Sequence, residues 1–291
     1  MSEKSSKSAK PVVTPECLKR DGYKLHEVLG EGSYSVVYRA TNTQNPDMNY
    51  ACKRYKINPS TIKWMERCLQ REMTLVMKVR HRSIVEAFTA IRAGDEAFLV
   101  IQYAPNGSVR SYLRKKLASN VFLKENKIRA WASDIFGAVS YLHGAAIAHR
   151  DLKCDNYILD ADMRPLVCDF SFACISDKPD TRFVCMVDTV CGTTSYLAPE
   201  VHSLKSGQKY DAKLSDVYAL GISLYEMFVK TVPYVGKWKL GDDDLVKRQI
   251  AKDYTYPKKI QVSAECRNLI DQLLEPSASN RITVNHALCH S

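Results

Sequence analysis

Residues 149–156 read His-Arg-Asp-Leu-Lys-Cys-Asp-Asn and place a base, cations, carboxylates and an amide in one short stretch. Residues 167–172 read Val-Cys-Asp-Phe-Ser-Phe and put a further carboxylate on a short apolar strand. The histidine alone would be more typical of a packed core residue than of a catalyst. Asp151, Asn156 five residues later, and then Asp169 form a far more specific combination, and this combination points to chemistry.

A glycine-containing stretch lies upstream, where residues 29–37 read Leu-Gly-Glu-Gly-Ser-Tyr-Ser-Val-Val between two strand patterns. Gly30 and Gly32 would let backbone amides approach a phosphate closely. Ser35 replaces the third glycine of a G-x-G-x-x-G motif, so an ordinary hairpin turn is an equal alternative for this stretch taken alone. A strand pattern follows it rather than a helix, which argues against a Rossmann or P-loop site.

Lys53 and Glu72 are a candidate ion pair. On the strand predicted at residues 50–56, Lys53 shares a face with Ala51, and a covered lysine needs an anion. Glu72 falls in the apolar stripe of the helix predicted at residues 60–79, where a carboxylate usually has a partner. A lysine reaching solvent and a glutamate at the edge of the stripe are the simpler alternatives, but together the two observations favour an ion pair.

Strand patterns dominate the first third of the chain and helical patterns dominate the rest. Strands are predicted at residues 23–29, 35–41, 50–56 and 97–103. Helices are predicted at residues 60–79, 126–143, 216–229 and 264–274. Turn-forming residues at 104–107 predict a hinge, and the polar residues 1–22 predict a mobile tail. The plan is α+β, with a small strand-rich lobe followed by a larger helical one.

The composition is that of a globular protein: 291 residues, 45% hydrophobic and 25% charged. No apolar run of about 18 residues and no secretory h-region occurs, so neither a membrane span nor export is expected. The net charge of +10 suggests a polyanionic partner such as a nucleotide, nucleic acid or membrane surface, or simply a basic surface. No zinc-finger spacing or aromatic-interleaved basic stripe supports nucleic acid. Ten cysteines without a CxxC pair predict reduced thiols.

These motifs, completed by Ala198-Pro199-Glu200, Asp216 and a late Arg281, resemble a eukaryotic protein kinase domain over about residues 23–288. The resemblance implies a bilobed fold, with an N-lobe at 23–103 and a C-lobe at 107–288. HRDLKCDN followed by DFS, with LGEGSYS and LQREM earlier, most resembles the testis-specific serine/threonine kinases of the calmodulin-dependent-kinase-like group. A role in male germ cells follows from this resemblance alone.

The resemblance implies the catalytic roles. Asp151 would accept the proton of a substrate hydroxyl, and Lys153 would steady the γ-phosphate of ATP. Asn156 and Asp169 would hold Mg²⁺. Lysine at position 153 is typical of serine/threonine kinases, so the partners expected are ATP and proteins with Ser or Thr acceptors. Neither nucleic acid nor a membrane is expected as a partner.

The resemblance also implies a nucleotide site in which Glu72 orients Lys53 toward the α- and β-phosphates. Val37, Ala51 and Ile158 would sandwich the adenine, and the backbone of Gln102 and Ala104 would hydrogen-bond its edge. The complete predicted set is Leu29, Gly30, Glu31, Gly32, Ser33, Tyr34, Ser35, Val37, Ala51, Lys53, Ile101, Gln102, Ala104 and Ile158.

Activation is predicted to depend on Arg150 and Thr189. A fixed guanidinium beside the catalytic base suits a phosphate, and Thr189 lies in the loop between Asp169 and Glu200. Phosphorylation of Thr189 by an upstream kinase would order that loop. An unmodified loop threonine is the alternative. The expected location is the cytoplasm, with access to the nucleus.

Several positions depart from the family pattern. Ser171 replaces the glycine after Asp169-Phe170 and is expected to restrict switching of that segment. Ser108 stands where kinases that prefer basic substrates often carry glutamate, although Asp155 is expected to keep one acidic contact. Cys168 lies immediately before Asp169, within reach of a reactive ligand. The main alternative to an active kinase is a pseudokinase that binds nucleotide without turnover, but Lys53, Asp151, Asn156 and Asp169 are all present.

Overall fold

The computed structural model describes residues 12–32, 35–56, 62–176 and 185–290, without the side chains of residues 62–65 and 68. The chain divides into two compact units, residues 1–66 with 86–103 and residues 67–85 with 104–291. The second boundary follows Tyr103, directly before the turn predicted at 104–107. Helix α2 was expected to belong wholly to the smaller lobe, but its residues from Arg67 onward group with the larger unit.

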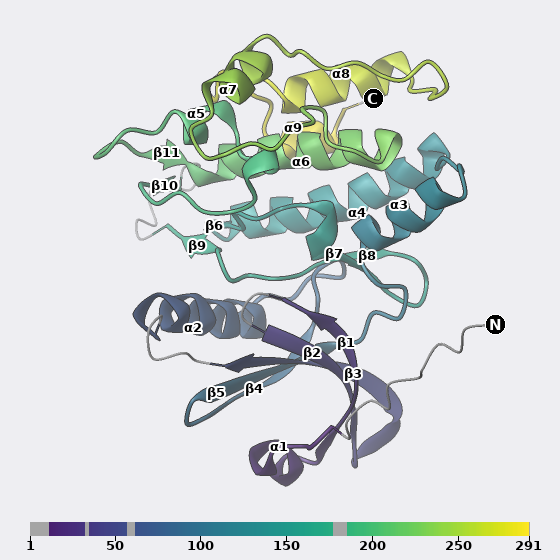
Figure 1. Cartoon of the computed structure of the whole chain (residues 1–291), viewed down its shortest axis with the longest axis vertical. Helices are drawn as coiled ribbons and strands as arrows, with labels where there is room; N and C mark the ends of the chain where they lie inside the picture. Colours follow the sequence, from purple (N-terminus) through teal and green to yellow (C-terminus); the bar gives the residue numbers. More distant parts are fainter. Residues whose placement is uncertain (1–11, 33–34, 57–61, 177–184, 291) are drawn as a thin grey trace, which may run out of the picture. The chain divides into compact units, whose positions relative to one another are not determined.

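The smaller unit is built on a five-stranded antiparallel sheet with the strand order β1-β2-β3-β5-β4 (Figure 1). Its strands are β1 (Tyr23–Glu31), β2 (Ser35–Asn42), β3 (Asn45–Lys56), β4 (Ala87–Ala93) and β5 (Glu96–Gln102). Strand β4 was not predicted, because its Ala- and Thr-containing sequence alternates weakly. It forms because β5 provides a full ladder of backbone partners.

Residues 12–22 differ from the mobile tail expected for the whole of 1–22. Helix α1 (Glu16–Arg20) forms there, and Leu18 is fully buried in a core that includes Tyr23, Leu25 and Phe98. The Leu25 backbone N–H also donates to Thr14 Oγ1 at 2.9 Å. The tail expectation is therefore corrected for this segment: one leucine among polar neighbours gives no periodic signal, but the sheet offers it a burial site.

The larger unit is mainly helical (Figure 1). Its helical elements are α2 (Ile62–Lys78, from Arg67), α3 (Val109–Ala118), α4 (Glu125–Gly144), α5 (Pro199–His202), α6 (Ala212–Val229), α7 (Asp243–Ile250), α8 (Ala264–Leu273), α9 (Val284–Leu288) and the 3₁₀ turns at Cys154–Asn156 and Thr194–Tyr196. Helix α6 is buried almost throughout. It starts four residues before the predicted boundary at Asp216, because Asp211 caps it by accepting from the Lys213 N–H at 3.0 Å. Among the described helices, none has the length and apolar character of a membrane span.

Short two-stranded pairs hold the loops of this unit: β6 (Ile147–Ala148) with β9 (Cys174–Ile175), β7 (Tyr157–Leu159) with β8 (Pro165–Val167), and β10 (Met186–Val187) with β11 (Tyr210–Asp211). Arg281 forms a two-pronged ion pair with Glu200 at 2.7 and 2.9 Å, and its side chain is fully buried. Arg281 also stacks over Tyr218, 5.0 Å from the ring centroid. The late arginine thus fixes the Ala-Pro-Glu segment from 81 positions away.

Candidate active site

Asp151 is the centre of a hydrogen-bond network in the larger unit. Its Oδ2 atom accepts from Lys153 Nζ at 2.7 Å and from Asn156 Nδ2 at 3.0 Å. Its Oδ1 atom accepts from Thr193 Oγ1 at 2.9 Å, and Thr193 Oγ1 accepts from Lys153 Nζ at 2.7 Å. Because the Asp151 side chain is only 6% exposed, these donors compensate the loss of water around its charge.

The backbone of this loop is held by Asp216 from helix α6. Its carboxylate accepts from the backbone N–H groups of His149, at 2.8 Å, and Arg150, at 2.7 Å. Arg150 has a left-handed backbone with φ of 67°, which the two bonds help to maintain. The fully buried His149 ring contacts the Cys168 carbonyl at 3.0 Å through Nε2. The histidine is thus a structural link to the strand before Asp169.

Asn156 and Asp169, the predicted Mg²⁺ ligands, lie on connected segments, since the Cys168 N–H donates to the Asn156 carbonyl at 3.0 Å. The Asn156 amide nitrogen donates to the Asp151 carbonyl at 2.8 Å, which fixes the side chain and leaves its oxygen as the atom that could bind a metal ion. Asp169 has a left-handed backbone with φ of 66°. A carboxylate and an amide oxygen are hard donors that suit Mg²⁺, so the residues present fit the ion.

Ser171 joins two of the predicted catalytic carboxylates. Its hydroxyl oxygen lies 2.5 Å from Asp169 Oδ1 and 2.6 Å from Glu72 Oε2. A hydroxyl has one proton, so the two carboxylates share one donor and each receives a weaker bond than it would alone. A glycine could not make either contact. These two contacts are the means by which Ser171 is expected to restrict the movement of the segment after Asp169.

Gly192 brings the following loop against the catalytic loop. Its φ is +101°, and a Cβ atom there would lie 2.6 Å from the Arg150 carbonyl oxygen. Only glycine tolerates both the conformation and the close approach. This approach places Thr193 on Asp151, which the sequence analysis did not anticipate. The Cys-Gly-Thr sequence at residues 191–193 was the one feature of the sequence that could have indicated this contact.

Arg150 and Thr189 lie in contact with each other, as the prediction of a phosphate site requires. Arg150 Nη2 donates to Thr189 Oγ1 at 2.9 Å and also contacts the Thr189 carbonyl and the Tyr210 hydroxyl. Arg150 Nε is buried and has no hydrogen-bond partner among the described residues. A cavity of about 970 Å³ adjoins this contact. Its basic lining residues are Arg67, Arg71, Arg150 and Lys209.

The predicted nucleotide residues of the smaller unit share one face of its sheet. Val37 lies directly opposite Lys53, and Ala51 lies directly opposite Ile101. Because opposite residues and residues two apart share a face, these four side chains form one surface. Gly30 is also in register with Val37, at the edge of that surface.

The remaining predicted nucleotide residues are distributed over both units. Leu29, Gly30 and Glu31 lie in β1, Gly32 follows β1 and Ser35 begins β2, whereas Ser33 and Tyr34 lie outside the described residues. Gln102 ends β5, and its N–H donates to the Glu86 carbonyl at 2.8 Å. Its backbone carbonyl is therefore the group left for the predicted adenine contact. Ala104 and Ile158 belong to the larger unit, with Ile158 in β7.

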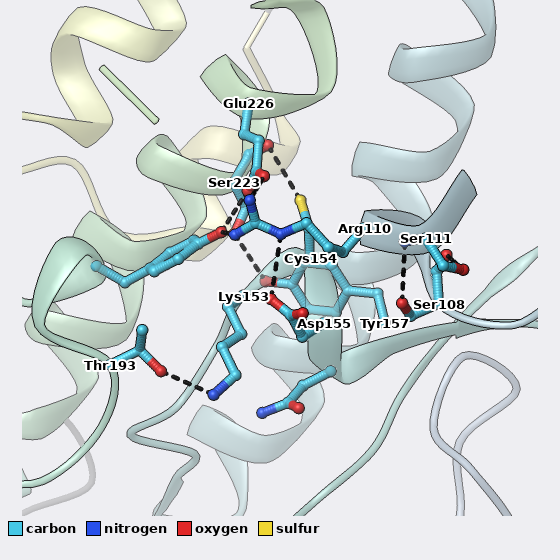
Figure 2. A network of polar contacts seen from close by, with 12 residues as sticks. Ser108, Arg110, Ser111, Lys153, Cys154, Asp155, Tyr157, Thr193, Ser223 and Glu226 are labelled. Atoms are coloured by element: carbon cyan, nitrogen blue, oxygen red, sulfur yellow. Dashed lines mark hydrogen bonds and ion pairs between the residues drawn. The ribbon is translucent and has the colours of Figure 1, made fainter. Parts of the chain in front are cut away.

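Arg110 on helix α3 neutralises two acidic groups beside the catalytic loop (Figure 2). Its Nε donates to Asp155 at 3.2 Å, and its Nη1 forms an ion pair with the fully buried Glu226. Burial raises the pKa of Glu226, and Arg110 opposes that rise. Asp155 was expected to remain an acidic contact for a substrate, but Arg110 already pairs with it. Arg110 could not be predicted from the sequence, because its partners Asp155 and Glu226 are far away from it in the chain.

Ser108 has a structural use at the start of α3. Its hydroxyl accepts from the Ser111 N–H at 3.1 Å and caps the helix (Figure 2). Ser111 returns a hydrogen bond to the Ser108 carbonyl at 2.7 Å. The serine that stands here in place of glutamate therefore caps helix α3.

The family model for the protein kinase domain matches residues 23–291. This chain belongs to the protein kinase family. It is 30% identical to testis-specific serine/threonine-protein kinase 1 of Mus musculus, over 94% of this chain and 72% of that protein. It is also 30% identical to testis-specific serine/threonine-protein kinase 3 of the same species, over 93% of this chain and 95% of that protein. CBL-interacting protein kinase 31 of Oryza sativa subsp. japonica is 28% identical over 97% of this chain.

Family membership makes the chain a serine/threonine-type protein kinase, an ATP-binding transferase. The resemblance stated from the motifs is confirmed, as is the α+β, bilobed fold class. The pseudokinase alternative receives no support from the comparisons. The roles of the individual residues stay predictions.

Proposed function

We propose that this kinase transfers the γ-phosphoryl group of ATP to serine or threonine hydroxyls of proteins, with Asp151 as the base. The observation that carries the proposal is the Asp151 network with Lys153, Asn156 and Thr193. Within the described contacts, Asp151 Oδ1 accepts from Thr193 alone, so it keeps a lone pair for a substrate hydroxyl. The ammonium group of Lys153 pairs with Asp151 at 2.7 Å and would hold a γ-phosphate oxygen beside the base.

Asp169 and Asn156 are the residues that would hold Mg²⁺ in this kinase. When bound, the ion offsets the negative charge that develops on the transferred group. The chain's own part is positioning: the Asn156 amide is oriented by its two bonds to Asp151, and the backbone before Asp169 is tied to Asn156 through the Cys168 N–H. Both segments are tied to His149 and Asp216, so the base and the metal ligands are positioned together.

ATP is proposed to lie against the sheet face of Val37, Ala51, Lys53 and Ile101, beneath the backbone around Gly30 and Gly32. A Cβ added at Gly30 would meet no described atom within 4 Å, so packing of the fold does not require a glycine there. Close approach of a phosphate gives a reason for it. Lys53 would contact the α- and β-phosphates, with Glu72 as the residue that orients it.

We further propose that phosphorylation of Thr189 by an upstream kinase activates the enzyme. Arg150, with a buried and unpaired Nε among the described groups, already lies on the threonine side chain. Arg67, Arg71 and Lys209 line the adjoining cavity and supply further positive charge for a phosphate. An added phosphate would convert a neutral contact into charge-assisted bonds and order the segment that carries Thr193.

A role in male germ cells is proposed from the similarity to the testis-specific kinases of mouse and human. The cytoplasm, with access to the nucleus, is the proposed location. Imaging of germ cells with an antibody against the endogenous chain tests both statements. Exclusive residence in another compartment would contradict the location, and absence of the protein from those cells would contradict the tissue role.

The decisive experiment compares wild type with Asp151→Asn in a labelled-ATP assay on a generic basic protein. Loss of the base should lower kcat by ~10²–10⁴-fold with little change in the KM for ATP. Asp162→Asn is the matched control, because its carboxylate is 74% exposed and pairs only with the surface Arg164 among described residues. Equal incorporation by wild type and Asp151→Asn would refute Asp151 as the base.

A further inference from the structure

Two buried cysteines face each other in the segment between Asp169 and Thr189. Cys174 lies in β9 and Cys185 immediately precedes β10, and their sulfur atoms are 3.2 Å apart. The residues are 8% and 1% exposed. A disulfide bond is about 2.05 Å long, so the sulfur atoms need to approach by only about 1 Å to form one. Neither thiol has a part in phosphoryl transfer.

The proximity of the two thiols is enforced from outside their own segment. Cys174 is paired in register with Ala148 of strand β6. The Cys185 N–H donates to the Asp211 carboxylate at 3.1 Å, and its carbonyl accepts from the Ala212 N–H at 2.9 Å. Strand β6 and the start of helix α6 therefore hold the two cysteines independently, and a bond between them requires little movement of the backbone.

Both thiols line the cavity of about 970 Å³ described above, which gives a small oxidant a route to them. The cavity is rich in guanidinium and ammonium groups, and positive charge favours a thiolate over a thiol. The hydrogen bond between the two thiols lowers the pKa of Cys174, with a further lowering by Arg150, in spite of burial. The same hydrogen bond, together with burial, raises the pKa of Cys185. Cys174 is also the more exposed of the two residues, at 8% against 1%, so we expect it to be the nucleophile of the pair and Cys185 to be the thiol that reacts second.

We propose that Cys174 and Cys185 are a modification site at which a peroxide produces a reversible disulfide. The Cys174 thiolate attacks one peroxide oxygen, the O–O bond breaks, and the hydroxide that leaves takes up a proton to become water. The resulting sulfenic acid is attacked by the Cys185 sulfur. The S–S bond forms as the S–O bond breaks, and the departing hydroxide takes the Cys185 proton. Two thiols are oxidised and one peroxide is reduced to two molecules of water.

The disulfide would join β9 to the residue before β10, four residues ahead of Thr189. Because both cysteines are already in place, oxidation would preserve the arrangement seen here and oppose displacement of β10. Thr189 would then be held at Arg150 in the oxidised kinase. Formation of the bond itself does not depend on any role of Thr189 in activation, so the two proposals fail separately.

The test uses the full chain, reduced, freed of reductant and treated with increasing hydrogen peroxide before alkylation and non-reducing peptide mapping. The expected result is a peptide pair joined through Cys174 and Cys185, with loss of two of the ten thiols and full reversal by dithiothreitol. Cys185→Ser should abolish the link and leave a Cys174 sulfenic acid that dimedone captures. Cys266→Ser, on helix α8, is the matched control and should form the link as wild type does.

Three results would overturn the proposal. One is the absence of the link at peroxide concentrations that oxidise other cysteines of the chain. Another is a disulfide from Cys174 to Cys191 in place of Cys185. The third is an unchanged loss of two thiols in Cys185→Ser. The mapping of wild type needs no substitution, so its outcome decides the matter even where a serine variant folds poorly.

Discussion

The surroundings of Asp151 and those of the adjacent Arg150, which contacts Thr189, differ in how completely their polar groups are paired. Asp151 receives donors from Lys153, Asn156 and Thr193, and Glu226 is paired with Arg110 nearby. The guanidinium of Arg150, one residue earlier, meets only the neutral Thr189 and Tyr210 in the described hydrogen bonds, and its Nε is unpaired there. The polar groups around Asp151 are already paired, whereas the Arg150 guanidinium could still bind an anion.

This difference has a physical basis. A buried, fully paired network resists rearrangement because each broken bond leaves an unpaired polar group. A guanidinium that is incompletely paired can gain a strong bond when a phosphate arrives, so its surroundings can respond to modification. The kinase thus combines a rigid catalytic loop with a neighbouring segment whose order depends on added charge.

The largest effect on stability is expected where the paired region loses its cation. Arg110→Ala leaves the fully buried Glu226 without its ion-pair partner, which should lower the free energy of unfolding by ~3–5 kcal/mol. Lys247→Ala removes a pair with side chains 75% and 81% exposed and should change it by less than ~1 kcal/mol. Urea denaturation of both variants measures the contrast. Equal changes in the free energy of unfolding would mean that the Arg110–Glu226 pair stabilises the fold no more than a surface pair does.

Gly192→Ala should break the connection between the two regions. The new Cβ would lie 2.6 Å from the Arg150 carbonyl at a φ of +101° and push Thr193 away from Asp151. Strain of about 1–3 kcal/mol corresponds to a fall in kcat of roughly 5–150-fold. Gly207→Ala is the control, since its φ of +80° is similarly strained but nothing lies within 4 Å of the new atom. Comparable activities of the two variants would argue against a steric link.

Thr189→Ala tests the incompletely paired region. If the phosphate completes the Arg150 site, the variant should lose activity by roughly 10-fold relative to phosphorylated wild type. Mass spectrometry of the active enzyme establishes whether Thr189 is modified, and kinase assays compare the two forms. Thr255→Ala is a control on a threonine whose backbone carbonyl alone enters the described hydrogen bonds. Full activity of Thr189→Ala would exclude the proposed regulation.

The smallest expected effect concerns the serine shared between Glu72 and Asp169. Ser171→Ala removes a hydroxyl that competes with Mg²⁺ for Asp169 Oδ1, so half-maximal activity should need ~2–5-fold less Mg²⁺. Ser171→Thr keeps the hydroxyl and should behave like wild type. Titration of Mg²⁺ in the kinase assay measures the shift. A higher Mg²⁺ requirement in Ser171→Ala would mean that the hydroxyl assists the metal site.

The main elements of both units could be predicted because their patterns are local. Helix α4 has a regular apolar stripe, and its observed bounds differ from the predicted 126–143 by one residue at each end. Strand β4 and helix α1 were not predicted, because neither has a clear hydrophobic periodicity in its own sequence. They depend on β5 and on the core around Leu18, which come from elsewhere in the chain.

Sequence alone determined the family, the catalytic loop and the candidate ligands, because short motifs with fixed spacing specify a chemistry wherever they lie. Only the tertiary structure decided how these groups are partnered. Ser171 reaches Glu72 across 99 positions, and Thr193 reaches Asp151 across 42. Such pairs depend on which segments pack together and on the direction of each side chain. Burial makes each pairing matter, because a polar group removed from water must find its partner within the fold.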